Sequence, residues 1–369
     1  MPGNHLGRSL TLTSWGESHG PAIGGVIDGL PPGIPLDMSL IQQQLDRRRP
    51  GQSSFVTPRN ELDHIQILSG FFEGKTLGTP LAFIIHNQNQ KSSDYTVLKD
   101  VFRPGHADYT YQQKYGHVDH RGGGRASARE TAIRVVAGAV ATQLLNHMIG
   151  PTVKILAALV QLGHKKTSGR WVEESISTNP FFCPDPSVVG EWGDYLREVR
   201  EAGKSVGALI EIQASGIPAG LGEPVYDKLD ADLAKALMSI NAVKAVEIGD
   251  GFGSATAEAG FDEMGLSPDS KVTFTSNKAG GILGGISTGQ PIVCRIALKP
   301  TSSTKQVRTT LTKELIPTTL GIHGRHDPCV GIRAVPIAQS MVAFTLADHL
   351  LRWRGQCGPI GSFDRDQTI

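Results

Sequence analysis

The chain has 369 residues, with 36 Lys and Arg against 35 Asp and Glu, which gives a net charge of +1. This balance provides no global field that would attract nucleic acid or an anionic membrane, so neither partner is expected and any affinity for anions must be local. The four cysteines form no C-x-x-C pair, and no apolar stretch has the length of a signal peptide or a membrane span. We therefore expect a soluble, cytoplasmic protein without a metal site or a disulfide framework.

The N-terminal third predicts two strands, a capped helix and a long polar segment. Residues 10–14 and 23–27 have the pattern of strands on either side of a Gly-rich turn, and Asp37 can cap a helix that Pro50 ends. Residues 87–125 are polar and rich in Gly, His and Asp. So long a polar segment indicates a loop with a function or with mobility.

A buried helix is expected next in the chain. Ser127 and Glu130 have the S-x-x-E spacing of a capping box, and residues 132–149 are apolar on nearly every helical face. The remaining expected elements are a strand at 207–215, a helix at 230–239, a strand at 272–276 and a helix that starts at Pro336 and reaches Leu351.

One local match within the chain bears on the architecture. The pattern G-x-x-I-G-G-V-x-x-G-x-P of residues 20–31 recurs as G-x-x-L-G-G-I-x-x-G-x-P at residues 280–291. Two matching turns suggest duplicated halves around a pseudo-two-fold axis, with a ligand site formed jointly by both. The alternative is chance similarity, because Gly-rich motifs are easily matched.

Two motifs near the N-terminus have residues suited to proton transfer and to anions. The segment G-E-S-H-G at residues 16–20 places His19 between glycines, where its imidazole can donate a proton; the alternative is an ordinary hydrogen-bonded surface histidine. The segment R-R-R-P-G at residues 47–51 gathers three guanidinium groups that could hold a polyanionic small molecule. The alternative is a solvated basic helix end, which the helix dipole favours.

Later motifs add phosphate-binding chemistry. R-P-G-H-A-D at residues 103–108 precedes D-H-R-G-G-G-R-A-S at 119–127, where three glycines lead into the expected helix and its N-terminal N–H groups can bind an anion. K-P-T-S-S at 299–303 combines a lysine, hydroxyls and amides, and G-R-H-D-P-C at 324–329 offers Asp327 as a positioned base. Ordinary turn chemistry is the alternative for each. No complete dinucleotide or P-loop fingerprint is present, which disfavours a Rossmann-type site.

Together with S-I-N-A-V-K and G-I-L-G-G-I-S-T-G, these segments resemble the chorismate synthase family, in the same order, over residues 16–329. The resemblance implies an α+β fold of one domain at residues 1–354. After the expected C-terminal helix, residues 355–369 have the pattern of a loose tail. Helices are then sandwiched between antiparallel β-sheets, with an internal pseudo-two-fold repeat and assembly into a homotetramer. It also implies a lyase that uses reduced FMN to eliminate phosphate from 5-enolpyruvylshikimate-3-phosphate, which gives chorismate.

The resemblance also implies roles for single residues. His19 is expected to protonate the departing phosphate, His106 to donate a proton to the reduced flavin, and Asp327 to act with flavin N5 as a base, so the three should line one cavity. The FMN-contacting positions of the family fall on Arg125, Ala126, Ser127, Asn241, Ala242, Gly284, Lys299, Pro300, Thr301, Ser302, Ser303 and Arg325.

Three arginines are the expected clamps for the phosphate and carboxylates of the substrate, namely Arg48, Arg129 and Arg325. Together with Arg48 and Arg129, Ser54 is assigned to the substrate or NADP site. Many family members have an arginine where this chain has Ser54, so a phosphate- or nucleotide-facing cation is expected to be missing. Flavin reduction by NADPH on the enzyme itself and reduction by an external flavin reductase both stay open.

Two functions of other classes are alternatives to this one. A non-catalytic FMN- or phosphometabolite-binding protein would need none of His19, His106 and Asp327, all of which are present. An RNA-binding module would normally show a net basic domain or aromatic stacking platforms, and the aromatic residues, 6% of the chain, are scattered.

Overall fold

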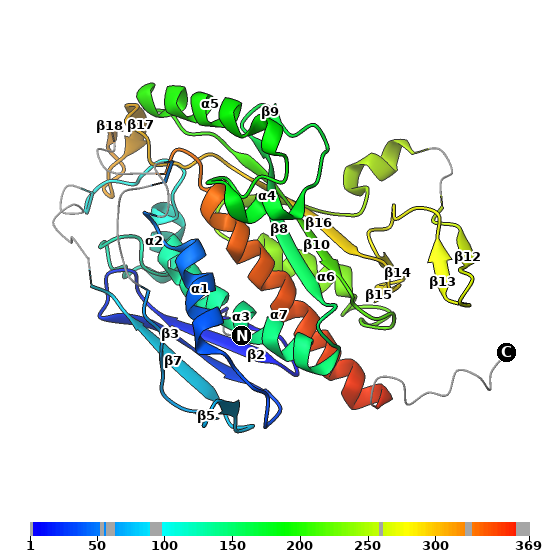
Figure 1. The fold of residues 1–369 in the computed structure, drawn as a ribbon. Helices are drawn as coiled ribbons and strands as arrows, with labels where there is room; N and C mark the ends of the chain where they lie inside the picture. Colours follow the sequence, from blue (N-terminus) through cyan, green and yellow to red (C-terminus); the bar gives the residue numbers. More distant parts are fainter. Residues whose placement is uncertain are drawn as a thin grey trace.

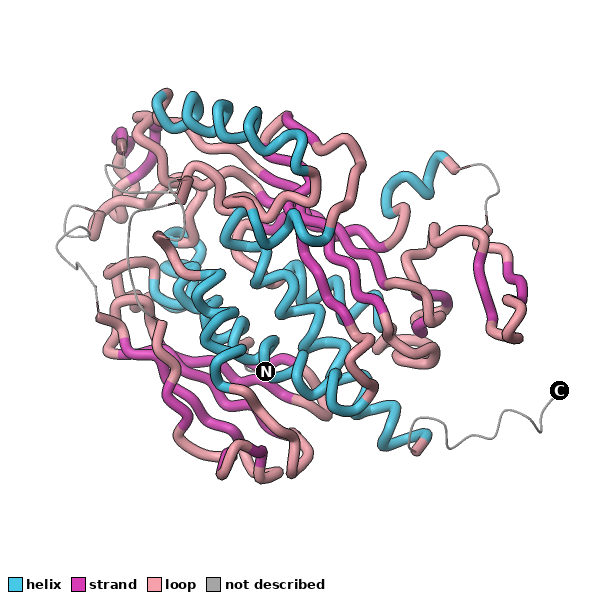
Figure 2. Tube along the Cα trace, viewed as in Figure 1, coloured by secondary structure: helices cyan, strands magenta, loops and turns pink. Residues whose placement is uncertain are grey.

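The computed structural model describes residues 3–51, 55–56, 63–88, 98–257, 261–321 and 327–358. This part of the chain forms two five-stranded antiparallel sheets with a layer of helices between them (Figure 1, Figure 2). The expected α+β fold, with helices sandwiched between antiparallel sheets, is confirmed.

The two sheets have the strand orders β1-β2-β3-β7-β4 and β11-β16-β10-β8-β9. The strands of the first sheet are β1 (His5–Leu6), β2 (Thr11–Gly16), β3 (Ala22–Asp28), β4 (Gln66–Ile67) and β7 (Leu81–His86). The strands of the second sheet are β8 (Lys154–Leu162), β9 (Lys165–Lys166), β10 (Ala208–Ser215), β11 (Val243–Ile248) and β16 (Ile292–Leu298). Buried and partly exposed residues alternate along β10, because one face of the sheet packs on the helices and the other faces outward.

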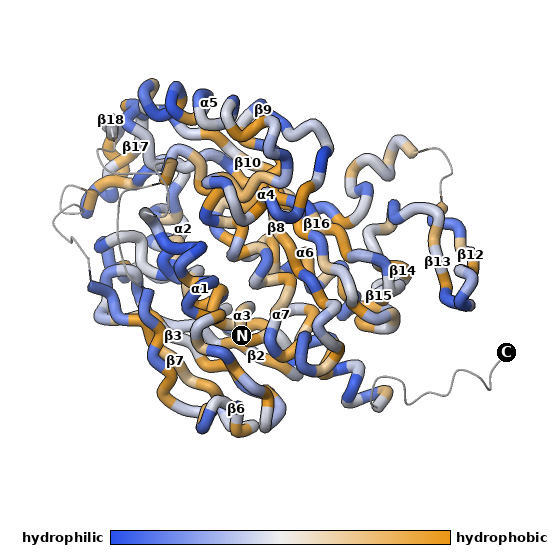
Figure 3. The backbone as a smooth tube through the Cα atoms, viewed as in Figure 1, coloured by the Kyte–Doolittle hydropathy of each residue, from blue (hydrophilic) through white to orange (hydrophobic). Residues whose placement is uncertain are grey.

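Four helices form the inner layer. They are α1 (Met38–Arg48), α3 (Thr131–Met148), α6 (Leu229–Met238) and α7 (Gly331–Cys357). Asp37 caps α1 as predicted, since its side chain accepts a hydrogen bond of 2.8 Å from the backbone N–H of Ser39. In Figure 3 the hydrophobic segments gather on these helices and on the strands that face them.

The remaining elements lie outside this layer. The helices among them are α2 (Asp108–Tyr115), α4 (Glu173–Thr178) and α5 (Val189–Glu201), with short 3-10 turns at Gly124–Ala126, Ala128–Glu130, Pro186–Val188 and Gly251–Thr256. The small hairpins are β5 (Phe71–Phe72) with β6 (Lys75–Thr76), β12 (Met264–Leu266) with β13 (Val272–Phe274), β14 (Ile282–Leu283) with β15 (Ile286–Ser287), and β17 (Arg308–Leu311) with β18 (Pro317–Leu320).

Helices α3 and α7 approach each other closely at Gly138. A Cβ atom built on Gly138 would lie 2.2 Å from the Cβ atom of Ser340, so only a residue without a side chain fits between the two backbones. Helix α7 is long and apolar enough to cross a membrane by length and composition alone, but 89% of its most apolar window is buried inside the fold. Its burial is that of a core helix.

The two halves of the chain repeat one topology. The order strand, strand, helix, strand, helix describes β2, β3, α1, β7 and α3, and it also describes β8, β10, α6, β16 and α7. The second strand of each set lies between the other two, and the last helices of the two sets pack together. The expected internal repeat is therefore confirmed at the level of topology.

The sequence match that suggested the repeat lies at positions that are not equivalent. Residues 20–31 include β3, with Gly24 and Gly25 in the middle of the strand. In residues 280–291, Gly284 and Gly285 instead form the tight turn between β14 and β15, with φ angles of +61° and +87°. The matched glycines serve different backbone conformations, so this particular match was misleading.

Several predicted boundaries are also corrected. Residues 87–125 are not all loop, because they contain α2. Ser127 caps a 3-10 turn by accepting from the N–H of Arg129, and α3 begins only at Thr131. Helix α7 begins at Gly331, so Pro336 lies inside it.

At its other end α7 continues to Cys357. The boundary predicted at residue 354 therefore falls within the helix.

Candidate functional site

The loop between β2 and β3 presents His19. The hydroxyl of Ser18 lies 3.0 Å from Nδ1 of His19 and donates to the carbonyl of Gly122 at 3.2 Å. Because the serine has a single proton, this arrangement assigns a proton to Nδ1 of His19 and makes Nε2 the nitrogen that exchanges one. His19 itself is 8% exposed, so its ring is fixed rather than mobile on the surface.

The three consecutive glycines pack directly against this loop. Gly122, Gly123 and Gly124 all have positive φ angles, of +67°, +85° and +53°. A Cβ atom on Gly122 would lie 1.8 Å from Nδ1 of His19, and one on Gly124 would lie 2.6 Å from Oε2 of Glu17. The glycines are needed both for the backbone conformation and for the close approach to His19.

Asn87 holds the two ends of the His19 loop. Its amide nitrogen donates to the carbonyls of Glu17 and Gly20 at 3.0 Å and 2.8 Å. Its amide oxygen accepts from Nε of Arg129 at 2.9 Å. One side chain thus connects the backbone on either side of His19 to an arginine at the N-terminal end of α3.

Arg129 shares one buried carboxylate with Arg48. Asp63 is fully buried, receives Nη2 of Arg48 at 2.5 Å, and makes a short ion pair with Nη1 of Arg129. Burial alone would raise the pKa of Asp63, but the two guanidinium charges outweigh it and lower that pKa. Burial also lowers the pKa of Arg48 to about 10, which leaves it protonated at neutral pH.

Arg333, on α7, extends this network to Asp327. Its Nη1 donates to Oδ2 of Asp327 at 3.0 Å, and its Nε donates to the backbone carbonyl of Arg48 at 3.3 Å. Asp327 is nearly buried. A continuous set of hydrogen bonds and ion pairs therefore runs from the His19 loop to Asp327.

A second set of contacts surrounds His106. Its Nδ1 lies 3.1 Å from the carbonyl of Pro104, and its Nε2 lies 2.9 Å from the hydroxyl of Ser303. A carbonyl can only accept, so Nδ1 carries the proton and Nε2 accepts from Ser303. Burial lowers the pKa of His106, and the nearby charge of Arg103 lowers it further.

Lys299 ties the predicted phosphate-binding segment to the His106 loop. Its Nζ donates to the carbonyl of Gly105 at 2.7 Å and lies 3.3 Å from the hydroxyl of Ser302. Ser302 donates to the same carbonyl of Gly105 at 2.9 Å. The segments 103–108 and 299–303, which are far apart in the sequence, therefore form one unit.

Asn241 and Ala242 connect this unit to the N-terminus of α3. The amide of Asn241 donates to the carbonyl of Ala126 at 3.0 Å, and the carbonyl of Ala242 accepts from the backbone N–H of Lys299 at 2.9 Å. Ala242 has a φ angle of +70°, a conformation that non-glycine residues rarely adopt and that is typical of functional sites.

The comparisons with known proteins point to one family. The family model described as chorismate synthase matches residues 10–351. The chain is 57% identical to a protein named chorismate synthase from Rhodospirillum centenum, over 98% of this chain and 97% of that protein. The chain belongs to the chorismate synthase family. Members of this family are lyases that catalyse the final step of the shikimate pathway, so the expected family and class of reaction are confirmed.

Two further members support the assignment. A chorismate synthase of Gluconacetobacter diazotrophicus is 56% identical over 97% of this chain and all of that protein. A crystal structure titled as chorismate synthase superposes with a TM-score of 0.73 at 31% identity, over 95% of this chain and 93% of that chain.

Not every position implied by the family pattern takes part in the contacts around His19, His106 and Asp327. The side chain of Arg125 binds to β2. Its guanidinium donates to the hydroxyl of Ser14 at 2.6 Å and to the carbonyl of Gly16 at 3.2 Å. Gly284 lies at the β14–β15 turn, which Figure 1 shows far from α2 and from the β17–β18 hairpin. Ser54 and Arg325 lie outside the described residues.

Two cavities adjoin these contacts, and they are lined by different residues. The larger, of about 440 Å³, is lined by Lys299 to Ser302 among other residues, and the smaller, of about 20 Å³, lies between Asn241 and Arg333. Neither of the two is lined by His19, His106 or Asp327. The expectation of one cavity shared by these three side chains therefore stays a prediction.

The sequence does not predict three residues that hold these contacts together, namely Asp63, Asn87 and Arg333. Their partners are distant in the sequence: Asn87 is 70 positions from Glu17, and Asp63 is 66 positions from Arg129. The one local signal is at Asn87, a polar residue that directly follows the buried strand β7.

Proposed function

We propose that the chain binds reduced FMN and eliminates phosphate from 5-enolpyruvylshikimate-3-phosphate to give chorismate. The observation that carries this proposal is the continuity of the polar contacts. The His19 loop is joined to Asp327 through Asn87, Arg129, Asp63, Arg48 and Arg333. Such a network holds acids, bases and cations in fixed positions, as proton transfer and phosphate departure require.

The residues proposed for FMN have features that a ligand would explain. Oδ1 of Asn241 and Oγ1 of Thr301 are buried and have no hydrogen-bond partner within the described residues. Buried polar groups are normally paired, so both atoms fit a ligand that brings its own polar groups. The residues proposed to hold FMN are Ala126, Ser127, Asn241, Ala242, Lys299, Pro300, Thr301, Ser302 and Ser303, with Arg125, Gly284 and Arg325 proposed from the family pattern alone.

When bound, reduced FMN supplies electron density transiently, which explains why a reaction without net redox change needs a reduced cofactor. The protein must then handle charge and protons. When the C3–O bond of the substrate breaks, the imidazolium form of His19 donates its Nε2 proton to the departing phosphate. The proton on Nδ1 of His19 stays there, in its hydrogen bond to the hydroxyl of Ser18. Asp327 takes part in removing the C6 proton, and His106 holds and exchanges a proton at Nε2 beside the cofactor.

Arg48 and Arg129 supply fixed positive charge for the anionic substrate. Both are nearly buried and share Asp63, so neither guanidinium has to be ordered when the substrate binds. Ser54 is uncharged, so it adds no positive charge at a position where many family members have an arginine.

The finer statements on assembly, reductant and location are also proposals. Self-association into a homotetramer is supported by exposed apolar side chains, among them Tyr226, Phe252 and Leu266. Either NADPH acting on the enzyme or an external flavin reductase reduces the flavin. A cytoplasmic location is supported by Cys183, Cys294 and Cys329, which are unpaired and buried.

The test is an anaerobic reaction of the protein with reduced FMN and 5-enolpyruvylshikimate-3-phosphate. We expect chorismate and inorganic phosphate in equal amounts, and no product with oxidised FMN alone. Absence of both products with reduced FMN would overturn the proposal. A second assay in air with NADPH and FMN but without a reductase distinguishes the two sources of electrons, since turnover there requires that the enzyme reduce its own flavin.

A further inference from the structure

Asn87 directly follows β7, and the pairing of β3 with β7 places it beside the His19 loop. The last pair of this ladder is Ala22 with His86, and the next hydrogen bond, of 3.0 Å, runs from the backbone N–H of Asn87 to the carbonyl of Pro21. The two strands are neighbours in the first sheet (Figure 1). The sheet therefore fixes the backbone of Asn87, and a change of its side chain leaves this backbone hydrogen bond in place.

The amide group of Asn87 fits its surroundings in one orientation. Its nitrogen donates to the carbonyls of Glu17 and Gly20, and its oxygen accepts from Nε of Arg129 at 2.9 Å. Carbonyls only accept and a guanidinium only donates, so the reversed amide would satisfy none of the three groups. The contacts need a donor and an acceptor on one short side chain, which asparagine provides.

Each of these contacts reaches a group with a part in the proposed chemistry. Glu17 and Gly20 lie on either side of His19 in the sequence, and the N–H of Gly20 donates to the carbonyl of Glu17 at 3.1 Å, which closes the loop into a turn. Arg129 is one of the proposed clamps for the anionic substrate. The side chain of Asn87 thus lies between the loop that carries the proposed acid and a proposed substrate cation.

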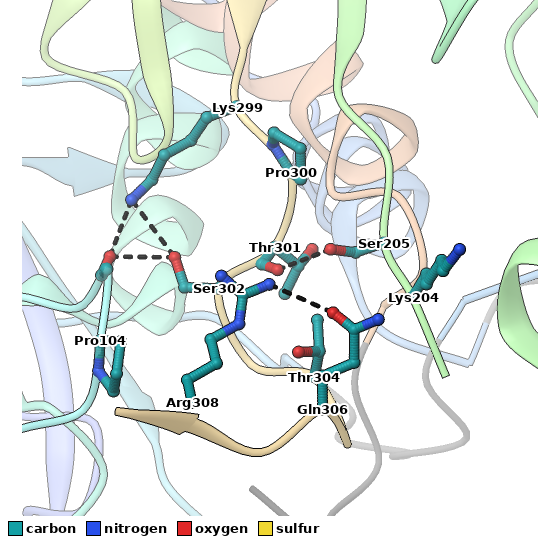
Figure 4. Close-up of a pocket in the computed structure, with 11 residues that line it drawn as sticks. Pro104, Lys204, Ser205, Lys299, Pro300, Thr301, Ser302, Thr304, Gln306 and Arg308 are labelled. Atoms are coloured by element: carbon teal, nitrogen blue, oxygen red, sulfur yellow. Dashed lines mark hydrogen bonds between the residues drawn. The ribbon is translucent and has the colours of Figure 1, made fainter. Parts of the chain in front are cut away.

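Asn87 itself has no place at the reacting atoms. It lines neither of the two cavities that adjoin the site, and Figure 4 shows the side chains that line the larger one. Its amide also has no pKa near neutrality, so it exchanges no proton in the reaction. Any effect of Asn87 on the rate must pass through the groups that it contacts.

We propose that Asn87 is a positioning residue, which fixes the His19 loop relative to Arg129 and so places the acid at the anion that this arginine binds. This inference rests on the proposed function, in which His19 protonates the departing phosphate. Proton transfer and charge stabilisation both require fixed positions, and a misplacement of about 1 Å can cost about 10²-fold in rate.

The first test is Asn87→Ala in the anaerobic assay with reduced FMN. This change removes the three side-chain contacts and keeps the hydrogen bond to Pro21. We expect kcat to fall by about tenfold or more, because the acid is no longer held in place. KM should change by less than about threefold, since Arg129 keeps its ion pair with Asp63. A higher KM with an unchanged kcat would contradict the proposal.

Asn179→Ala is the matched control. Asn179 is half-buried like Asn87, its amide nitrogen donates to the carbonyls of Ser175 and Cys183, and its oxygen accepts from the N–H groups of Phe181 and Cys183. It holds a loop in the same way, but that loop carries none of the proposed site residues. The control should keep its kcat and KM, and a loss of kcat as large as that of Asn87→Ala would reduce the effect to one of stability.

A second arm asks whether Asn87 acts through His19. The variants His19→Ala and Asn87→Ala/His19→Ala are compared in the same assay. Once the positioned imidazole is gone, the additional change at Asn87 should lower kcat by less than about threefold. A further fall as large as the one that Asn87→Ala causes in the native chain would overturn the proposal.

A third arm does not depend on turnover. NMR spectra of isotope-labelled histidine are recorded for the native chain, Asn87→Ala, Asn87→Asp and Asn179→Ala, and His19→Ala assigns the His19 signal. Asn87→Asp has the shape of asparagine but sets a carboxylate oxygen against two carbonyls, so it serves if Asn87→Ala does not fold. We expect the His19 signal to move in both Asn87 variants and to stay in the control.

The NMR result also separates this inference from the proposed function. If the native chain forms no chorismate but the His19 signal moves as expected, the proposed reaction is wrong and Asn87 still holds the His19 loop. If the native chain is active and the His19 signal is the same in the native chain and both Asn87 variants, Asn87 is not a positioning residue.

Discussion

Gly122 is the residue at which the site depends most directly on the absence of a side chain. Its Cβ position lies 1.8 Å from the His19 ring, and its φ angle is +67°. We expect Gly122→Ala to displace His19 and to lower turnover by about tenfold or more, while backbone strain costs about 1–2 kcal/mol of stability. Turnover and the free energy of unfolding are measured together.

Gly116→Ala is the control for this change. Gly116 has a similar φ angle of +70°, but a Cβ atom there meets nothing within 4 Å. The control should also lose stability through backbone strain, and it should keep its turnover. Equal turnover in the two variants would show that contact with His19 is not what Gly122 provides.

His106 gives a prediction that depends on pH. Because burial and the charge of Arg103 lower its pKa from the ordinary 6.5, its NMR titration should have a midpoint below that value. The folded-state pKa is lower than the unfolded one, so the stability that neutral His106 contributes is complete above about pH 6.5 and is lost as the pH falls through the folded pKa. A midpoint at or above 6.5 would contradict this environment.

The His106→Ala variant tests the role of the same residue in catalysis. We expect it to fold and to lose about 10²-fold or more in turnover under anaerobic, pre-reduced conditions, which is the usual contribution of a proton-transfer group. Turnover like that of the native chain would remove His106 from the mechanism.

At the scale of elements, Asp63 joins the C-terminal end of α1 to the N-terminal end of α3 through two arginines. Asp63→Asn leaves Arg48 and Arg129 buried without their shared carboxylate, and we expect a loss of about 3–5 kcal/mol in the free energy of unfolding. Asp194→Asn is the control, because its ion pair with Arg197 is exposed and should contribute less than about 1 kcal/mol. Similar losses in the two variants, by urea unfolding, would argue against the buried network.

The elements with local patterns were predicted well from the sequence. Residues 10–14, 23–27 and 207–215 are strands, and residues 132–149 and 230–239 are helices, each within one or two residues of the observed bounds. Their burial repeats with a period of 2 or 3.6, which a single stretch of sequence reveals. The motifs of the His19, His106 and Lys299 segments were recognisable for the same reason.

The rest could not be found locally because it depends on contacts between distant segments. Asp63 has no motif of its own, and its role appears only when α1 and α3 bring Arg48 and Arg129 to it. Pro336 predicts a helix start, but tertiary packing extends α7 in front of it to Gly331. Helix α2 has no buried residue, so it lacks the apolar periodicity that would have indicated it.

At the scale of the whole molecule, the two repeated halves are joined by the α3–α7 contact. Gly138→Ala would push a methyl group into the backbone of Ser340, and we expect a loss of about 1–3 kcal/mol in stability. Gly190→Ala, in α5, meets nothing within 4 Å and should leave stability unchanged or raise it by up to about 1 kcal/mol. Thermal or urea unfolding compares the two, and a tolerated Gly138→Ala would mean that the halves are not held this tightly.

The account depends on His19, His106 and Asp327 acting at one site. The most direct measurement is an experimental structure of the complex with FMN and 5-enolpyruvylshikimate-3-phosphate. We expect His19 within hydrogen-bond distance, about 2.6–3.2 Å, of the substrate's phosphate, with His106 and Asp327 within the same distance of the flavin or connected to it through one water. Flavin and substrate bound together with any of these three side chains facing away from both would contradict the account.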